Sequence, residues 1–280
     1  MSDNALYIVA TPIGNLGDVT PRSVEVLKQV DVIAAEDTRH SRRLMNHFGI
    51  ETPMIPCHDH NERQQTERIL QKLHQGESVA LVSDAGTPLI SDPGFFLVRS
   101  VREAGFKIVP VPGACAIIAA LSVSGLTTDR FFFEGFLPAK GSGRRKKLEE
   151  LGVMPFTWGV YESTHRIMDS LKDFSEVLGG GRYMVLAREI TKTFETVIAG
   201  TVDEVLTSLE ADTDQRRGEF VLLVEGFKEE QDQSIDSDTV KWLSRLLQEL
   251  PPKKAAAIVA DVTGFKKKDL YNKALTLKQA

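Results

Sequence analysis

The 280-residue chain is long enough for two folded domains or for one large α/β unit with an appendage, and its 42% hydrophobic and 26% charged residues exclude global disorder. A net charge of −5 excludes binding of nucleic acid through overall positive charge, so any RNA contact must come from a local basic patch. Two distant cysteines, no signal-peptide pattern after Met1, and apolar runs far shorter than the roughly 18 residues of a membrane span lead us to expect a cytoplasmic protein without membrane contact.

The first half of the chain alternates short apolar runs with amphipathic segments. The first helix is predicted to start with Thr20 as its N-cap and Pro21 at its first position. In chain order we expect a strand at 6–10, a helix at 21–29, a strand at 30–35, a helix at 42–48, a strand at 54–56, a helix at 64–75, a strand at 78–83, a helix at 95–104, a strand at 107–111 and a helix at 112–124. Nearly continuous apolar strands predict a parallel sheet covered on both faces, with ligands at the carboxyl ends of its strands.

The pattern changes after a predicted boundary near Gly125–Asp129. Five strand patterns follow, with helical patterns between them, and they predict a mixed α+β second domain. The strands are expected at 130–136, 157–161, 183–187, 193–200 and 220–225, and the helices at 144–151, 166–174 and 202–210. We therefore divide this part of the chain into an N-terminal α/β domain at 1–126 and a second domain at 127–228.

The C-terminal segment is predicted to be a separate helical extension. An acidic, polar stretch at 229–238 is typical of a linker, and three short amphipathic patterns follow at 240–250, 252–261 and 267–275. The last two flank a turn containing Gly264, so residues 239–280 predict a helix-turn-helix. Its lysines form a local basic patch on an acidic protein, namely Lys253, Lys254, Lys266, Lys267, Lys268, Lys273 and Lys278.

Several common site motifs are missing from the sequence. There is no G-x-G-x-x-G after the first strand, no G-x-x-x-x-G-K-[ST] and no G-x-S-x-G, which argues against a nicotinamide enzyme, a P-loop NTPase and an α/β-hydrolase. The most informative run is Ser83–Gly94, which holds two prolines, two glycines and two aspartates directly after a strand. It is either a tight strand-to-helix connection or a ligand loop, and its twelve residues favour the ligand loop.

Two further segments leave alternatives open. Pro112–Ala116 opens an apolar helix with small residues, which suit either close helix packing or a ligand at the helix start. Cys115 has no neighbouring histidine in the sequence and is not expected to be a nucleophile. His58 and His60 could chelate a metal, but no further Cys/His cluster completes a set. We therefore expect no metal, and a polar substrate-contact loop that includes Asn61.

The segment Lys140–Lys147 carries five positive charges in eight residues. It is either a solvated mobile loop or a flexible arm that contacts phosphates. Its position just after the predicted domain boundary favours the arm, because clefts lie at such junctions.

Taken together, these motifs resemble the tetrapyrrole methylase superfamily and, within it, the cytidine 2′-O-methyltransferases of small-subunit ribosomal RNA. The resemblance covers about Leu6–Phe227, and the helical extension is similar to one found in the same group. It differs at Thr164, where the family pattern has proline. The motifs that carry the resemblance are Val9–Asp18, Ala35–Arg39, Ser83–Gly94, Pro112–Leu126, Gly135–Pro138 and Gly218–Gly226.

The resemblance implies two α/β domains, a homodimer, and S-adenosylmethionine as the cofactor, bound between the domains. Carried over by motif, the residues that would contact it are Pro12, Ile13, Asp84, Thr87, Ile90, Cys115 and Ala116 in the first domain and Tyr161, Ala187 and Phe220 in the second. The implied partner is small-subunit ribosomal RNA or the small ribosomal subunit, and the implied reaction is 2′-O-methylation of a cytidine in the decoding region.

A ribose hydroxyl is a poor nucleophile at neutral pH, so a positioned base is expected to take its proton as the methyl group is transferred. Glu36 and Asp37 at the end of the second strand, and Glu189 in the second domain, are the candidates. Each could equally be a structural ion pair. The candidates for holding the RNA are Arg39, Lys140, Arg144 and Arg145 for phosphates, with His58, His60 and Asn61 as substrate contacts.

Two other functions remain open at this point. A methylase of a small tetrapyrrole would share the fold, but it would not need the basic segment at 140–147 or the lysine-rich tail. A nucleic-acid-binding protein without enzymatic activity would explain the tail, but not the Pro/Gly loops at the strand ends. Turnover of a labelled methyl donor separates an enzyme from a binding protein.

Overall fold

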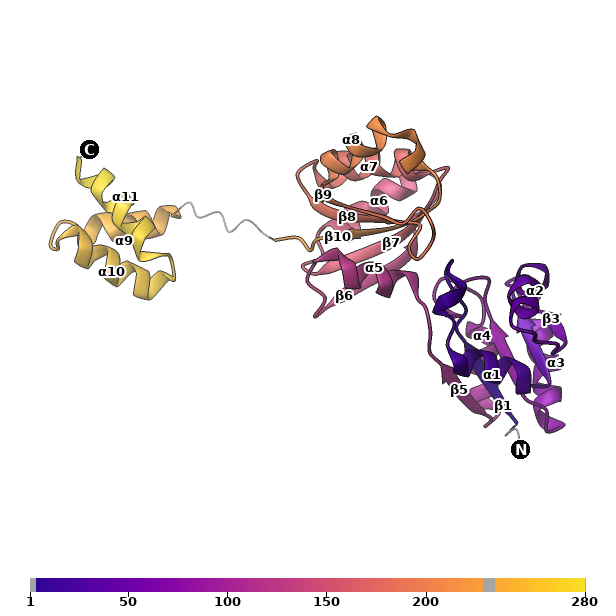
Figure 1. Cartoon of the computed structure of the whole chain (residues 1–280). Coiled ribbons are helices and arrows are strands. Elements are labelled where there is room, and N and C mark those ends of the chain that lie inside the picture. The colour runs from indigo at the N-terminus through magenta and orange to yellow at the C-terminus, as the bar shows by residue number, and fades with distance from the viewer. Residues whose placement is uncertain (1–3, 229–234, 280) are drawn as a thin grey trace. The chain divides into compact units, whose positions relative to one another are not determined.

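The computed structural model describes residues 4–228 and 235–279 (Figure 1). The chain forms two compact units, residues 1–227 and residues 228–280. The first unit contains two five-stranded sheets, and the second contains helices. Among the described residues, no helix combines the length and the apolar character needed to cross a membrane.

The first sheet contains only parallel strands, in the order β3-β2-β4-β1-β5, as predicted. Its elements are β1 Ala5–Val9, α1 Pro21–Gln29, β2 Val32–Ala35, α2 Thr38–His47, β3 Met54–Pro56, α3 Glu62–His74, β4 Val79–Val82, α4 Phe95–Glu103 and β5 Lys107–Val111, with a 3-10 turn at Leu16–Asp18. Alternate strand side chains bury against α1 and α2 on one face and against α3 and α4 on the other. This double burial explains the unbroken apolar runs.

Helix ends in this half follow the caps that the sequence provides. The Thr20 hydroxyl accepts a hydrogen bond from the Ser23 amide at 3.0 Å, so α1 begins where predicted. Helix α2 begins at Thr38, four residues earlier than predicted, because the Asp37 carboxylate accepts hydrogen bonds from the amides of Arg39 and His40. Asp37 therefore acts as an N-cap, a role that the hydrophobic pattern alone does not reveal.

The second sheet is mixed, as predicted, with strand order β6-β7-β10-β8-β9. Only the β6–β7 pair is parallel. The elements after β5 are α5 Ala116–Ser124, β6 Phe131–Phe136, α6 Gly141–Gly152, β7 Thr157–Ser163, α7 Ile167–Leu178, β8 Tyr183–Arg188, β9 Thr196–Thr201, α8 Val202–Ala211 and β10 Glu219–Val224, with a 3-10 turn at Thr213–Arg216. Helices α6, α7 and α8 cover one face and α5 covers the other (Figure 1).

Helix α5 packs on the second sheet, although it precedes the boundary expected near Gly125–Asp129. Ile117 and Leu121 bury against Val185 and Leu223 in one apolar cluster. Residues of the second sheet cover the inner side of this apolar helix, while Ile118 and Val123 on its outer side stay exposed. The chain therefore leaves the first sheet before α5 rather than after it.

The prediction of a flexible arm at 140–147 is wrong. Residues Gly141–Gly152 form helix α6, and Arg144 is 5% exposed. Its guanidinium donates to the Asp173 carboxylate of α7 at 2.6 Å, and Arg145 donates to the other oxygen at 2.9 Å. Arg144 therefore holds two helices together and cannot also hold a phosphate.

The described residues of the second unit form three helices, α9 Ser237–Leu246, α10 Pro252–Thr263 and α11 Lys267–Gln279, as the amphipathic patterns predict. Leu243, Ala256 and Leu270 take part in its small core, and α10 ends at Gly264, whose φ is +78°. Of the predicted linker at 229–238, residues 229–234 lie outside the described residues. The last two residues of that linker already belong to α9, whose N-cap is Asp236.

Candidate active site

A cavity of about 340 Å³ lies at the carboxyl edge of the first sheet and is also lined by residues of β7, β8 and β10. The loops after β1, β2, β4 and β5 all contribute to it, as expected from parallel topology. Its lining is Ile13, Glu36, Asp84, Ala85, Gly86, Thr87, Ile90, Ser91, Asp92, Cys115, Ala116, Phe136, Tyr161, Glu162, Ser163, Ala187, Glu189, Ile190, Lys192, Glu219, Phe220 and Val221.

The loop at 83–94 is held rigidly beside this cavity. Thr11 and Gly86 exchange two backbone hydrogen bonds, at 2.8 and 3.1 Å, and the Thr87 hydroxyl donates to the Ala114 carbonyl at 2.9 Å. Leu89 and Ser91 both have positive φ, which costs free energy in residues with a side chain. A loop pinned in this conformation fits the ligand-loop interpretation of the sequence.

Two positions show how closely the walls of the cavity approach each other. Gly86 has a φ of +82°, and a Cβ there would lie 3.2 Å from Cγ2 of Ile13. At the second position, the Tyr161 hydroxyl accepts a hydrogen bond from the Ile117 amide, in the first turn of α5, at 3.2 Å. Burial raises the pKa of Tyr161 well above its usual range, so the phenol stays protonated.

Three carboxyl groups lie together on the side of the first sheet. The Glu36 carboxylate accepts a hydrogen bond from the Asp84 amide at 3.4 Å, and the Asp84 carboxylate accepts one from the Asp37 amide at 3.1 Å. Burial and the charges of nearby aspartates raise the pKa of Glu36. Burial likewise raises the pKa of Asp92. A carboxylate with a raised pKa is a better proton acceptor, so Glu36 has the chemistry of a general base.

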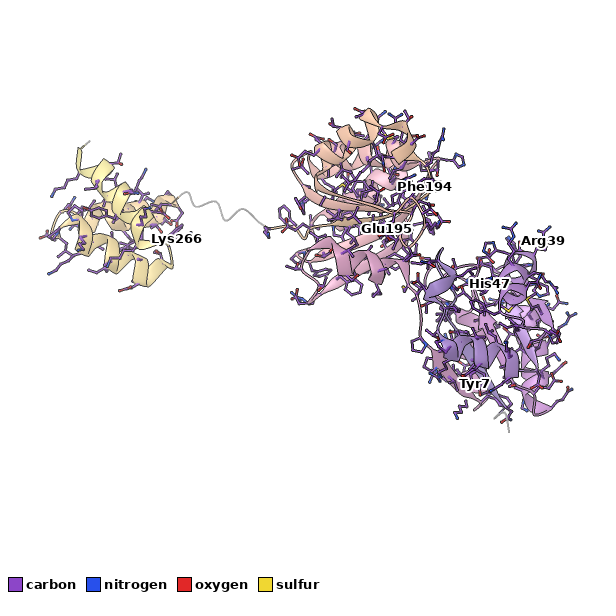
Figure 2. The ribbon with its side chains drawn as sticks, viewed as in Figure 1. Tyr7, Arg39, His47, Phe194, Glu195 and Lys266 are labelled. Atoms are coloured by element: carbon purple, nitrogen blue, oxygen red, sulfur yellow. The ribbon has the colours of Figure 1, made fainter. Side chains whose placement is uncertain are left out.

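The other predicted residues of this edge point elsewhere. Asp37 is engaged as the cap of α2 and does not line the cavity, and capping by the Arg39 and His40 amides lowers its pKa. The Arg39 side chain is 92% exposed and extends from the start of α2 (Figure 2). Apart from an ion pair with Asp37 at 3.6 Å, the Arg39 guanidinium faces solvent, where a phosphate could reach it.

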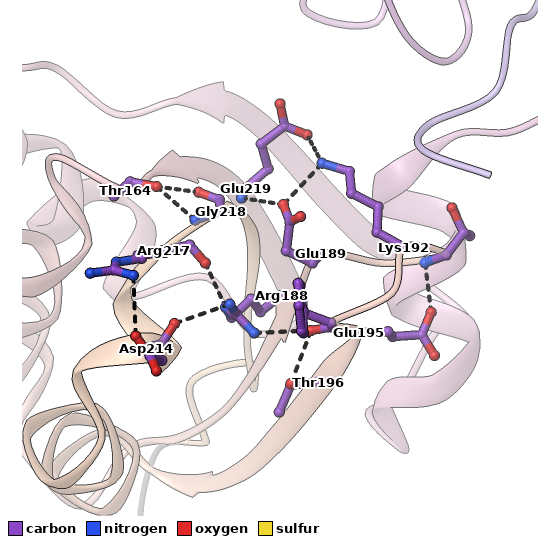
Figure 3. Close-up of polar contacts among 12 residues, drawn as sticks. Thr164, Arg188, Glu189, Lys192, Glu195, Thr196, Asp214, Arg217, Gly218 and Glu219 are labelled. Carbon is purple, nitrogen blue, oxygen red and sulfur yellow. Dashed lines mark hydrogen bonds and ion pairs between the residues drawn. The ribbon is translucent and has the colours of Figure 1, made fainter.

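On the opposite side of the cavity, Lys192 joins two carboxylates. Its Nζ lies 2.9 Å from the Glu189 carboxylate and 2.9 Å from that of Glu219, and the Glu219 amide donates to Glu189 at 2.9 Å (Figure 3). Burial alone would raise the pKa of Glu189, but these hydrogen bonds outweigh it and lower the pKa. Glu189 is thus a held anion, which makes it a poorer proton acceptor than Glu36.

The side of the cavity that carries Lys192 is held in place by two polar side chains, those of Arg188 and Thr164 (Figure 3). The buried Arg188 guanidinium donates to the carbonyls of Arg217, Phe194 and Asp214 at 2.6, 2.9 and 3.0 Å. Thr164 donates to the Gly218 carbonyl at 2.8 Å and accepts from the Gly218 amide at 2.7 Å. The hydroxyl therefore ties the end of β7 to the start of β10.

Replacing Thr164 by valine keeps the shape and removes both hydrogen bonds, which leaves the two polar atoms of Gly218 without this partner. We expect the free energy of unfolding in urea to fall by about 1–3 kcal/mol. The control Thr193→Val changes an exposed threonine in the β8–β9 connection and is expected to stay within about 0.5 kcal/mol of the parent. Equal stability of the two variants would contradict this role for Thr164.

The polar loop after β3 lies beside a second hollow. His60 and Asn61 line it with Phe95 and Phe96. The His58 amide donates to the Asn61 side chain at 2.9 Å, which folds the loop back on itself. Among the described residues there is no group of three or more His, Cys, Asp or Glu side chains suited to a metal ion.

The structure brings together most of the residues that the sequence singled out. Every predicted cofactor contact except Pro12 lines the cavity, as do Glu36 and Glu189. Sequence reasoning missed Asp92 and Lys192. Asp92 lies in the Ser83–Gly94 run and could have been named from it, whereas nothing local to Lys192 indicates that it meets a glutamate 27 positions away.

Comparison with known proteins assigns this architecture to a class. Residues 5–206 match the model of the Tetrapyrrole (Corrin/Porphyrin) Methylases, and the chain belongs to that family. Solved structures share the fold at low identity: a diphthine synthase with a TM-score of 0.60 (13% identical, 79% of this chain, 90% of the other) and the methyltransferase CobJ with 0.59 (20% identical, 80% and 95%). These confirm the predicted fold.

Nearer relatives are named Ribosomal RNA small subunit methyltransferase I. The protein of Escherichia coli O157:H7 is 55% identical over 98% of this chain and 96% of its own length, and that of Pseudomonas aeruginosa is 54% identical over 98% of both. Residues 233–278 match the RsmI C-terminal HTH domain, which agrees with the predicted helix-turn-helix. A uroporphyrin-III C-methyl transferase of Thermus thermophilus, with a TM-score of 0.55 (18% identical, 78% of this chain, 96% of the other), is described as complexed with S-adenyl homocysteine.

Proposed function

We propose that the protein transfers a methyl group from S-adenosylmethionine to small-subunit ribosomal RNA, and that the acceptor is the 2′-hydroxyl of a cytidine in the decoding region. The observation that carries the proposal is identity above 50% with methyltransferases named for this RNA, over nearly the full length of both chains. At 98% coverage, the aligned stretch runs through the part of the chain that forms the cavity and into the helical extension.

The chemistry of the cavity suits this cofactor. Its wall combines apolar side chains such as Ile90 and Phe220 with small residues such as Ala116 and Ala187, which leave room for a flat adenine ring. Asp84 and Asp92 provide negative charge that complements a positive sulfonium and ammonium. S-adenosylmethionine would supply the methyl group from its positively charged sulfur.

The residues of the chain then have separate tasks. Glu36, with its raised pKa, would accept the proton of the ribose hydroxyl as the new bond forms. Lys192, held between Glu189 and Glu219, would fix the far wall of the cavity against the substrate. Orientation of this kind supplies much of the rate of an in-line transfer.

Arg39 and Lys140 are the predicted phosphate contacts that remain exposed. Arg145 is partly exposed but shares Asp173 with Arg144, so it contributes less free charge. The lysines of the helical extension would add attraction that is independent of base sequence.

We also propose that the protein works as a homodimer. The support from this chain is a set of exposed apolar side chains on α5 and the neighbouring edge strand β6, which include Ile118, Val123 and Phe131. An apolar surface of this kind is typical of a contact between subunits.

Methyl transfer from labelled S-adenosylmethionine tests the proposed function. Parallel reactions contain small ribosomal subunits lacking the modification, naked small-subunit RNA, or a tetrapyrrole precursor. We expect label on ribosomal RNA, recovered after digestion as 2′-O-methylcytidine. Label on the tetrapyrrole alone would overturn the acceptor, and RNA binding without any label would indicate a binding protein.

A further inference from the structure

We propose that Phe95 and Phe96, together with Arg63, form a stacking platform for an unpaired nucleobase next to the nucleotide that is methylated. The inference rests on the proposed function and adds to it a second binding site, outside the cofactor cavity, for a neighbouring base of the RNA strand.

The two phenylalanines are exposed side by side at the start of α4. Phe95 is 68% exposed and Phe96 is 37% exposed, although the following residue, Leu97, is fully buried in the core of the first sheet. Single exposed hydrophobic residues are common, but two adjacent rings flanking one hollow are not explained by packing. Aromatic rings exposed in this way provide flat faces on which bases of single-stranded RNA stack.

The platform is fixed in place by a bond between two helices. Gly94 is the N-cap of α4 and has no side chain to satisfy the helix amides. The Glu62 carboxylate, at the start of α3, takes the role of the missing cap, because it accepts a hydrogen bond from the Leu97 amide at 3.0 Å. The starts of α3 and α4 are thereby held together, which fixes the backbone that carries Phe95 and Phe96.

This arrangement also places a cation on one ring. The Arg63 guanidinium carbon lies 5.3 Å from the centre of the Phe96 ring, within the range of a cation–π contact. Arg63 itself is exposed. A planar guanidinium and two phenyl rings are the groups that recognise the face of a nucleobase in single-stranded RNA.

Polar side chains at the edge of the hollow complete the match to a base. His60, Asn61 and Gln64 line it together with the rings, and all three can exchange hydrogen bonds with the edge of a base. Two carboxylates, Asp59 and Glu62, line the hollow against one guanidinium, that of Arg63. This lining repels a bare phosphate and suits a neutral base better.

The platform and the cofactor cavity are neighbours. Asp92 lines the cavity, and only Pro93 and Gly94 separate it from Phe95 in the chain. Burial is the main cause of the raised pKa of Asp92 and of Glu36, and the negative charge of Asp59, which lines the second hollow, adds to it. A strand whose ribose meets Glu36 can therefore place an adjacent base on Phe95.

The test compares Phe95→Ala, Phe95→Leu and Phe95→Trp with the parent enzyme. Steady-state methylation of subunits lacking the modification is measured for each variant, together with binding to a single-stranded oligonucleotide of the target sequence. Loss of one stacked base, worth about 1–3 kcal/mol, predicts weaker RNA binding by roughly 5- to 150-fold in the alanine and leucine variants. The tryptophan variant should bind RNA at least as well as the parent. The affinity for S-adenosylmethionine should stay unchanged in all three variants.

Val153→Ala is the matched control, because Val153 is also 68% exposed but lies at the end of α6, outside both hollows. If Phe95→Leu retains the RNA affinity of the parent, or if Phe95→Ala affects neither KM nor RNA binding, the stacking platform is refuted while the proposed function stands. If the parent enzyme itself transfers no label to RNA, the proposed function fails instead.

Discussion

Replacing Glu36 by glutamine should reduce the rate constant of methyl transfer to RNA by about 10²- to 10⁴-fold, the usual contribution of a general base. Glutamine has the size of glutamate but cannot accept the proton of the ribose hydroxyl. The side chain lies at one edge of the cavity, so the affinity for S-adenosylmethionine should change little. Single-turnover methylation combined with equilibrium binding of the cofactor separates these two effects.

The control for this experiment is Asp37→Asn, at the neighbouring position. Asparagine caps a helix about as well as aspartate, so this variant should fold and keep its turnover. If Asp37→Asn abolishes turnover and Glu36→Gln does not, the roles that we propose for the two residues are reversed. The comparison is informative because the two side chains are adjacent in sequence but face different surroundings.

The same assignment predicts a dependence on pH. The raised pKa of Glu36 means that its carboxyl group loses its proton at a higher pH than an exposed glutamate does. Since the base acts in its ionised form, kcat/KM should rise with pH through this raised pKa and then level off. In the glutamine variant, that step should be missing from the residual activity.

Replacing Asp173 by alanine should lower the free energy of unfolding by about 3–5 kcal/mol, because it leaves the buried Arg144 guanidinium without its partner. Urea denaturation followed by circular dichroism measures this loss. Lys172→Ala, at an exposed position of the same helix, should change the stability by no more than about 0.5 kcal/mol.

A second variant distinguishes a structural pair from a phosphate contact. The double change Arg144→Met and Asp173→Leu removes both charges, and buried pairs replaced in this way by apolar residues often cost little stability. We expect this variant to recover much of the stability and to keep its affinity for RNA. A strong loss of RNA affinity in a stable double variant would restore the phosphate role that the sequence suggested for Arg144.

Much of the cavity follows from the sequence because local signals and topology agree. Thr20 and Pro21 mark a helix start, and loops that follow parallel strands must gather at one edge. The composition of the run at 83–94 and its place after a parallel strand therefore predict a ligand loop. Strand positions in the second domain were also predictable, since its apolar runs are separated by clear helical patterns.

The errors arise where tertiary partners decide the outcome. Five positive charges at 140–147 look like a mobile arm, and only Asp173 on α7 explains why Arg144 is buried. The apolar pattern of α5 predicts burial without saying which sheet buries it. Asp37 and Glu36 are both acidic residues after a strand, and their different roles depend on the α2 amides and on Asp84.

The position of α5 places the connection between the two sheets beside the cavity. Because α5 already packs on the second sheet, the peptide segment 112–115, between β5 and α5, is where the chain passes from one sheet to the other. Cys115 at its end lines the cavity, and a Cβ at Gly113 would lie only 2.8 Å from that of Ala10. The connection between the two sheets is thus itself part of the cavity wall, so a change in the backbone of residues 112–115 would alter the shape of the cavity and the join between the sheets together.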